Sequence, residues 1–67
     1  MTKVVTLEQG LYEPCLLGVF ASFEDAEAGA RAAFAEDDWR TNETYTATLW
    51  SVGQPDRIEQ REWRLER

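Results

Sequence analysis

The chain has 67 residues, of which seven are basic and thirteen are acidic, so its formal net charge is −6. A chain of this length forms one domain, residues 1–67, with a small hydrophobic core. The negative charge argues against direct binding of nucleic acid, because phosphate recognition requires a basic surface. No apolar run approaches the roughly 18 residues of a membrane span, and the N-terminus lacks the apolar stretch of a signal peptide. We therefore expect a cytoplasmic protein that does not enter a membrane.

The chemistry of catalysis is poorly represented in this chain. Histidine is absent and Cys15 is the single cysteine, so the commonest general base and the commonest metal ligand are missing. Cys15 also lacks a histidine partner, and we expect it to be a small core residue at the start of a strand. The four glycines are dispersed and form no phosphate-binding loop. We expect no enzymatic activity, no cofactor and no metal site.

Two strands are predicted in the first third of the chain. Residues 3–9 are rich in β-branched side chains and place Val5 and Leu7 on one face. Residues 10–14 contain a glycine and a proline, which end this strand. Residues 15–20 are apolar almost throughout, a pattern typical of a central strand that is covered on at least one face.

A helix follows. Ser22 is a good N-cap, and Asp25 three residues later resembles the second half of a capping box. Residues 26–37 are rich in alanine and contain no proline or β-branched residue, which predicts a helix that ends near residues 38–40. Gly29 weakens a helix by about 1 kcal/mol relative to alanine, which indicates that another backbone approaches closely there. The expected buried stripe consists of Phe23, Ala26, Ala30, Ala33 and Phe34.

The last third of the chain predicts a hairpin. Residues 44–52 alternate regularly, so one face carries Tyr45, Ala47 and Leu49 while the other carries three threonines and Trp50. Residues 53–56 have turn chemistry. Residues 57–67 favour an edge strand with a bulge, with a short helix as the alternative.

This order of elements predicts the fold class. We expect an α+β protein made of a single small ββαββ domain, with one helix packed across an antiparallel sheet.

Most of the negative charge lies in the helical region. Residues 23–38 set six acids against Arg31 alone. Acids in the first turns are favoured by the helix dipole, and Glu27 has the right spacing for an ion pair with Arg31. Three acids near the C-terminal end oppose the dipole, so they are either a solvated charge run or a functional feature. Two lines of carboxylates flank a ridge of alanines on this helix and could imitate a short stretch of duplex phosphates.

Three tryptophans in so short a chain also require an explanation. Trp39, Trp50 and Trp63 either cover the edges of a thin core or anchor a partner, since tryptophan is enriched at interface hot spots. Trp39, beside acidic residues, and Trp50, on the threonine face, are the candidates for partner binding. The arginines of residues 57–67 alternate with glutamates, and we expect local or cross-strand ion pairs there.

The run LGVFASFEDAEA at residues 17–28, between a strand and a Thr- and Tyr-rich strand, resembles small uncharacterised ββαββ proteins of phages and mobile elements. A small acidic chain of this kind also resembles anti-CRISPR inhibitors, several of which are DNA mimics that occupy the target-DNA channel of a CRISPR effector, often a type I complex. The resemblance implies an inhibitory role for Glu24, Asp25, Glu27, Glu36, Asp37 and Asp38, with Glu43 as an addition.

Two hypotheses follow from these patterns. In the first, the protein is a non-enzymatic monomeric inhibitor in the cytoplasm of a bacterial host. Its acidic residues, with Trp39 and Trp50, then bind a basic protein surface that normally holds DNA, such as a nucleic-acid-binding protein or a CRISPR effector. In the alternative, it is a small adaptor or assembly protein that interacts through an aromatic sheet face around Trp50 or through an edge strand, as a homodimer.

Overall fold

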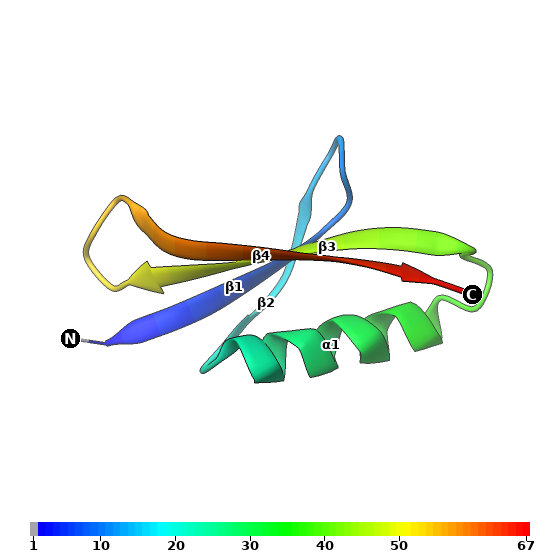
Figure 1. The fold of residues 1–67 in the computed structure, drawn as a ribbon, viewed down its shortest axis with the longest axis horizontal. Coiled ribbons are helices and arrows are strands. Elements are labelled where there is room, and N and C mark those ends of the chain that lie inside the picture. The colour runs from blue at the N-terminus through cyan, green and yellow to red at the C-terminus, as the bar shows by residue number, and fades with distance from the viewer. Residues whose placement is uncertain (1) are drawn as a thin grey trace.

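A computed structural model describes residues 2–67 of the chain. Its elements follow in the order strand, strand, helix, strand, strand, which confirms the predicted α+β fold (Figure 1). The elements are β1 (Lys3–Gln9), β2 (Cys15–Phe20), α1 (Phe23–Glu36), β3 (Asn42–Ser51) and β4 (Arg57–Glu66).

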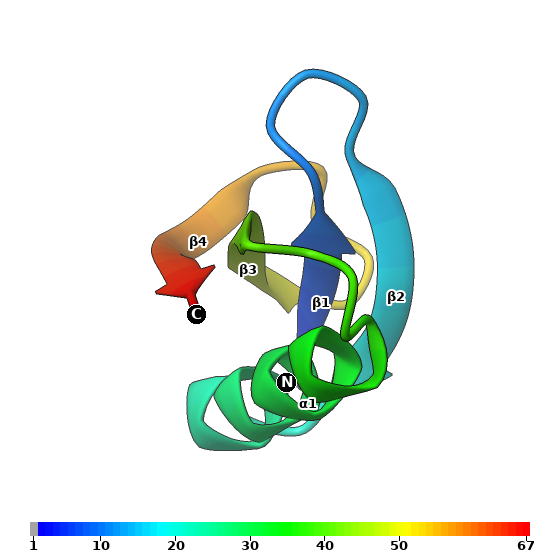
Figure 2. The same cartoon turned by 90° about the vertical axis from the view of Figure 1, so that its right-hand side faces the viewer.

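The four strands form one antiparallel sheet in the order β2-β1-β3-β4. Two hairpins contribute two strands each, and the pairing of β1 with β3 joins them. Gly10 and Gly53, in the hairpin loops, have φ angles of 110° and 86°, a backbone conformation that favours glycine. The helix lies across one face of the sheet and contacts all four strands, whereas the β1–β2 loop rises on the opposite side (Figure 2).

The helix begins as predicted and ends slightly early. The Oγ of Ser22 accepts a hydrogen bond from the backbone N–H of Asp25 at 3.2 Å, as an N-cap does. The helix ends at Glu36, before the predicted end near residues 38–40. There the N–H of Arg40 donates to the carbonyl of Asp37 at 3.0 Å, so the chain turns away from the helix axis.

The core lies between α1 and the two central strands. All seven of its members are at most 7% exposed, and they come from the faces that the alternation and the helical periodicity predict. Alanine side chains on the helix allow it to approach the sheet closely. The members are Val5, Leu7, Ala26, Ala30, Phe34, Tyr45 and Ala47.

The prediction that residues 15–20 form a central strand is wrong. β2 is an edge strand of the sheet, and most of its side chains are exposed. Cys15, expected in the core, is exposed as well. Hydrophobic content alone cannot distinguish a strand covered by its own chain from a strand left uncovered at a sheet edge. The apolar character of Leu16, Leu17 and Val19 therefore has no explanation within the fold of residues 2–67.

The prediction of an edge strand with a bulge is confirmed for β4. The register with β3 shifts between Leu49 and Trp50, because Leu49 is opposite Glu59 whereas Trp50 is opposite Arg57. Ile58 is the extra residue of this bulge and is half exposed. The bulge lets Trp63 and Leu65 face the helix and pack against the core.

Gly29 is required by a close approach, but of a side chain rather than a backbone. A Cβ at this position would lie 2.6 Å from the ζ carbon of Phe20. A Cβ at Gly18 would lie 3.3 Å from the same ring, which is therefore confined between two glycines. This contact fixes the distance between α1 and β2.

We expect Gly29→Ala to destabilise the protein although alanine is the better helix former. Overpacking against Phe20 costs about 1–3 kcal/mol, which exceeds the gain of about 1 kcal/mol in helix propensity. Chemical denaturation measures the change in the free energy of unfolding. Ala32→Gly, on the exposed side of α1, is the reference for propensity alone and should lose about 1 kcal/mol. In a Phe20→Leu background Gly29→Ala should become stabilising; destabilisation there too would contradict a steric role of the ring.

Candidate binding surface

The exposed side of α1 and the turn after it carry acidic residues that have no ion-pair partner within residues 2–67. Arg31 pairs with Glu27 through a 3.1 Å contact between Nη2 and Oε2, as the spacing predicts. No ion pair within residues 2–67 involves the other exposed acids of this region. We call this set the acidic helix face, and its members are Glu24, Asp25, Glu36 and Asp38.

The alanine ridge between these acids is present on the surface. Ala28, Ala32 and Ala35 are all exposed, because the helix turns its other side to the sheet. Glu24 and Glu36 are 12 residues apart, or about 18 Å at 1.5 Å per residue. A duplex advances about five base pairs over that length. The acidic helix face is therefore a low surface with carboxylates spread along the helix axis.

Asp37 and Glu43 have different surroundings from the four free acids. Both bind Arg40: its Nε donates to Oδ2 of Asp37 at 3.2 Å, and its Nη1 forms a short contact with Oε2 of Glu43. Asp37 Oδ2 also accepts a long hydrogen bond of 3.4 Å from Gln9 Nε2. The other carboxylate oxygen of Glu43 accepts from the backbone N–H of Thr44 at 3.0 Å. These two carboxylates stabilise the turn after the helix and are less available to a partner than the free acids.

The C-terminal end of α1 receives the cation that its own sequence lacks. Arg67 donates from Nη2 to the carbonyl of Asp37 at 2.9 Å and to that of Phe34. Its guanidinium lies 4.5 Å from the centre of the Phe34 ring, and its Nε donates to the carbonyl of Arg40 at 2.7 Å. A cation at this position satisfies helix carbonyls and complements the dipole. Acids near the helix end are therefore tolerated for a structural reason. Nothing in the local sequence signals this contact.

The tryptophans occupy three different environments. Trp39, in the turn after the acidic helix, is 72% exposed and is stacked by the guanidinium of Arg40 at 4.4 Å. Trp50 is half-buried on the sheet face away from the helix, where its Nε1 donates to Thr6 Oγ1 at 2.8 Å. Trp63 packs against the core. Trp39 therefore adjoins the acidic helix face, whereas Trp50 lies on the opposite side of the molecule.

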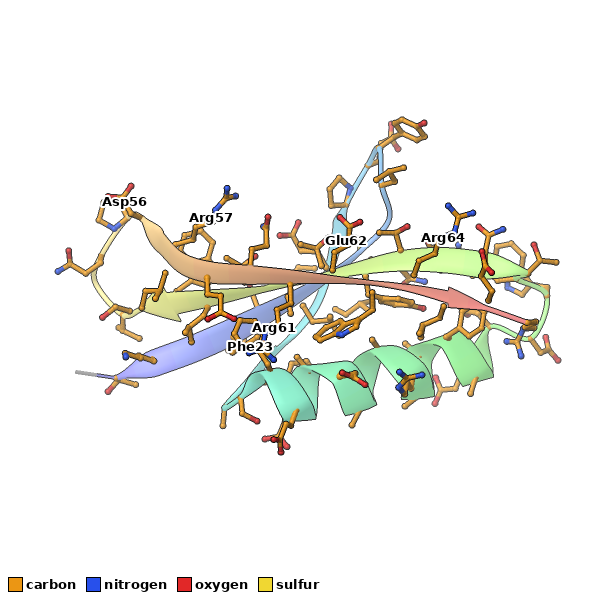
Figure 3. The ribbon with its side chains drawn as sticks, viewed as in Figure 1. Phe23, Asp56, Arg57, Arg61, Glu62 and Arg64 are labelled. Carbon is orange, nitrogen blue, oxygen red and sulfur yellow. The ribbon has the colours of Figure 1, made fainter. Side chains whose placement is uncertain are left out.

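The sheet face away from the helix is nearly neutral. We call it the open sheet face. Register places the side chains of Arg57 and Arg64 there together with Glu8, Glu62 and Glu66. Figure 3 shows Arg57, Glu62 and Arg64 pointing away from the helix, whereas Arg61 points toward it.

Local contacts account for two of the β4 arginines. Arg61 pairs with Glu59 at 2.9 Å and lies over the Phe23 ring, and Arg64 pairs with Glu66 at 3.1 Å. The prediction of local ion pairs is confirmed for these two residues. They therefore do not form a free basic patch.

Features typical of catalytic or metal sites are sparse in the described part of the chain. Residues 2–67 contain no group of three or more Cys, Asp or Glu side chains placed to hold a metal ion. An open hollow of about 430 Å³ lies between α1 and β4, lined by Arg31, Phe34, Arg64, Leu65 and Glu66. In the same residues, no helix is both long enough and apolar enough to span a bilayer.

We expect Arg67→Ala to lower the free energy of unfolding by about 1–2 kcal/mol, because helix carbonyls lose a charged donor. Thermal and chemical denaturation measure the loss. Arg67→Lys keeps the charge but not the planar fork, so it should recover part of the stability. Equal stability of all three proteins would contradict the capping role.

Tyr45 is expected to make the folded protein less stable at alkaline pH. Burial raises the pKa of its hydroxyl above 10, and nearby Glu43 and Asp37 raise it further. The unfolded chain then loses this proton first, so stability falls as the pH rises through about 10. Unfolding measured at pH 9 and pH 11 should show a larger loss for the wild type than for Tyr45→Phe. An identical loss in the two proteins would argue against this role of Tyr45.

Comparison with known proteins adds no assignment to this geometry. No protein-family model, curated protein or solved structure matches the chain at a significant level. Proposals about function therefore depend on the surfaces described above.

Proposed function

We propose that the protein is a non-enzymatic inhibitor that binds a basic, nucleic-acid-holding protein surface through the acidic helix face. The observation that carries this proposal is the set of four exposed carboxylates without ion-pair partners among residues 2–67: Glu24, Asp25, Glu36 and Asp38. Paired surface charges gain little from a new partner, whereas unpaired ones add to its attraction. The proposal therefore rests on the free carboxylates rather than on the net charge of the chain.

Trp39 supports the same surface as an anchor. Its ring is 72% exposed and lies in the turn that follows the acidic helix. Exposed tryptophan rings contribute strongly to binding when a partner covers them, and the rim of such an interface is typically polar. Asp38, beside Trp39 in the chain, supplies a polar neighbour. Trp50 is not part of this surface, since it lies on the open sheet face.

The narrower form of the proposal is an anti-CRISPR protein that blocks target-DNA binding by a type I effector complex in a bacterial cytoplasm. The support for this form is the length of the acidic helix face, about 18 Å. A channel that holds duplex phosphates presents basic groups over such a length. Charge attraction would speed the encounter and make binding sensitive to salt.

The test is a competition assay with a purified type I effector complex and its fluorescently labelled target duplex. We expect the wild-type protein to reduce duplex binding in a dose-dependent way. The variant Glu24→Gln, Asp25→Asn, Glu36→Gln and Asp38→Asn should raise the inhibitor concentration required by roughly tenfold or more, because the steering charges are gone. Asp37 and Glu43 stay unchanged, since their neutralisation would disturb the ion pairs of Arg40.

A control variant separates local charge from net charge. It neutralises four acids that lie outside the acidic helix face and also lack ion pairs within residues 2–67, namely Glu8, Glu13, Asp56 and Glu62. Both variants gain four charge units relative to the wild type. The control should inhibit nearly as well as the wild type. Equal weakening of both variants would refute the assignment to the acidic helix face, and no inhibition by the wild type would refute the inhibitor role.

A further inference from the structure

β2 is an apolar edge strand with no strand on its outer side within residues 2–67. Leu16 and Val19 project from it with 60% and 59% of their surface exposed. Residues 14–21 contain no charged side chain. Such an edge leaves backbone N–H and C=O groups and apolar side chains available to another strand, a combination that natural proteins normally block.

The opposite edge of the sheet shows what a blocked edge looks like in this protein. Six of the ten residues of β4 are charged, and arginines and glutamates alternate along it. One edge is thus protected against strand addition, whereas the other lacks both charge and proline over Cys15–Phe20.

We propose that β2 pairs antiparallel with β2 of a second copy, which joins the two sheets across a twofold axis. Charge permits a second copy at this position. Two chains of net charge −6 repel each other as wholes, but residues 14–21 form a neutral segment where they can approach. Two identical strands related by a twofold axis are self-complementary, so the uncovered residues of one copy cover those of the other.

The faces of β2 match in this arrangement. The bulge at Leu17, where the register with β1 shifts, places Leu16 and Val19 on the open sheet face. Cys15 and Phe20 lie on the helix side. Full overlap of the two strands sets Leu16 opposite the partner's Val19 and Cys15 opposite the partner's Phe20. Exposed apolar side chains then meet on the open sheet face of the joint, the usual source of stability in a strand pair.

The same geometry limits the charge repulsion between the two copies and prevents assembly beyond a dimer. Each α1 begins shortly after its β2 ends, so the two helix N-termini lie at opposite ends of the joint, about 20 Å apart for six residues. This separation exceeds the Debye length of about 8 Å at physiological salt. Pairing also consumes both β2 edges and leaves only the charged β4 edges, so assembly stops at a dimer.

Sedimentation equilibrium over a range of protein concentrations tests the proposal. We expect the wild type to reach twice the chain mass of 7.7 kDa. Leu16→Lys with Val19→Lys should raise the dimer dissociation constant by roughly 100-fold, because burying lysines in the joint is costly. Ile58→Lys adds a lysine at a half-exposed position on the other edge and should leave the constant unchanged. Circular dichroism establishes that both variants remain folded.

Hydrogen exchange of the wild type distinguishes strand pairing from another mode of association. Amides of residues 15–20 should be protected in the dimer and lose that protection on dilution, while those of β4 should not depend on concentration. A wild type that stays monomeric, or a dimer whose β2 amides exchange as fast as those of the lysine variant, would overturn the proposal. The acidic helix variants leave β2 unchanged, so this proposal and the inhibitory surface are tested separately. A dimer would overturn only the expectation that the inhibitor is a monomer.

Discussion

The contact between α1 and one face of the sheet is the interaction on which the rest of the structure depends. This contact buries the hydrophobic core, in which small alanines of the helix pack with Val5, Leu7 and Ala47 of the central strands. The Phe20 ring, confined by Gly18 and Gly29, sets how closely the helix approaches β2. Because a single helix covers a single face, the open sheet face and the outer edge of β2 remain without cover from residues 2–67.

This asymmetry divides the charge of the molecule between two sides. The acids of α1 lie on its exposed surface, while the open sheet face carries arginines and glutamates in nearly equal numbers. The carboxylates of the acidic region fall into two groups, those that form ion pairs and those that do not. Asp37 and Glu43 stabilise the turn through their ion pairs with Arg40, whereas the members of the acidic helix face form no ion pair within residues 2–67. The net charge of −6 therefore overstates the free negative charge that a partner would contact at the end of the helix. It also gives no information about the uncharged edge strand β2.

Local sequence patterns predicted most of the fold, because helix caps, strand alternation and bulges depend on residues that are close together in the chain. Ser22, the alternation of β3 and the bulge of β4 all follow from spacing within a few positions. The site was predicted less completely. The exposure of Trp39 fits its place after the helix, but the pairing of Asp37 and Glu43 could not be read from charge alone. The contact of Arg67 with Phe34 spans 33 residues and carries no local signal.

The sequence by itself determined the element order, the buried faces and the concentration of acids on one helix, since periodicity and composition encode these directly. Only the tertiary structure decided which strand lies at an edge, because apolar content is the same whether a strand is covered by its own chain or by another. It also decided which carboxylates are free, because that depends on how Arg40 pairs with Asp37 and Glu43 after the end of α1. Strand order and the contact of Arg67 with the end of α1 arise from packing, and packing brings together residues that the chain keeps far apart.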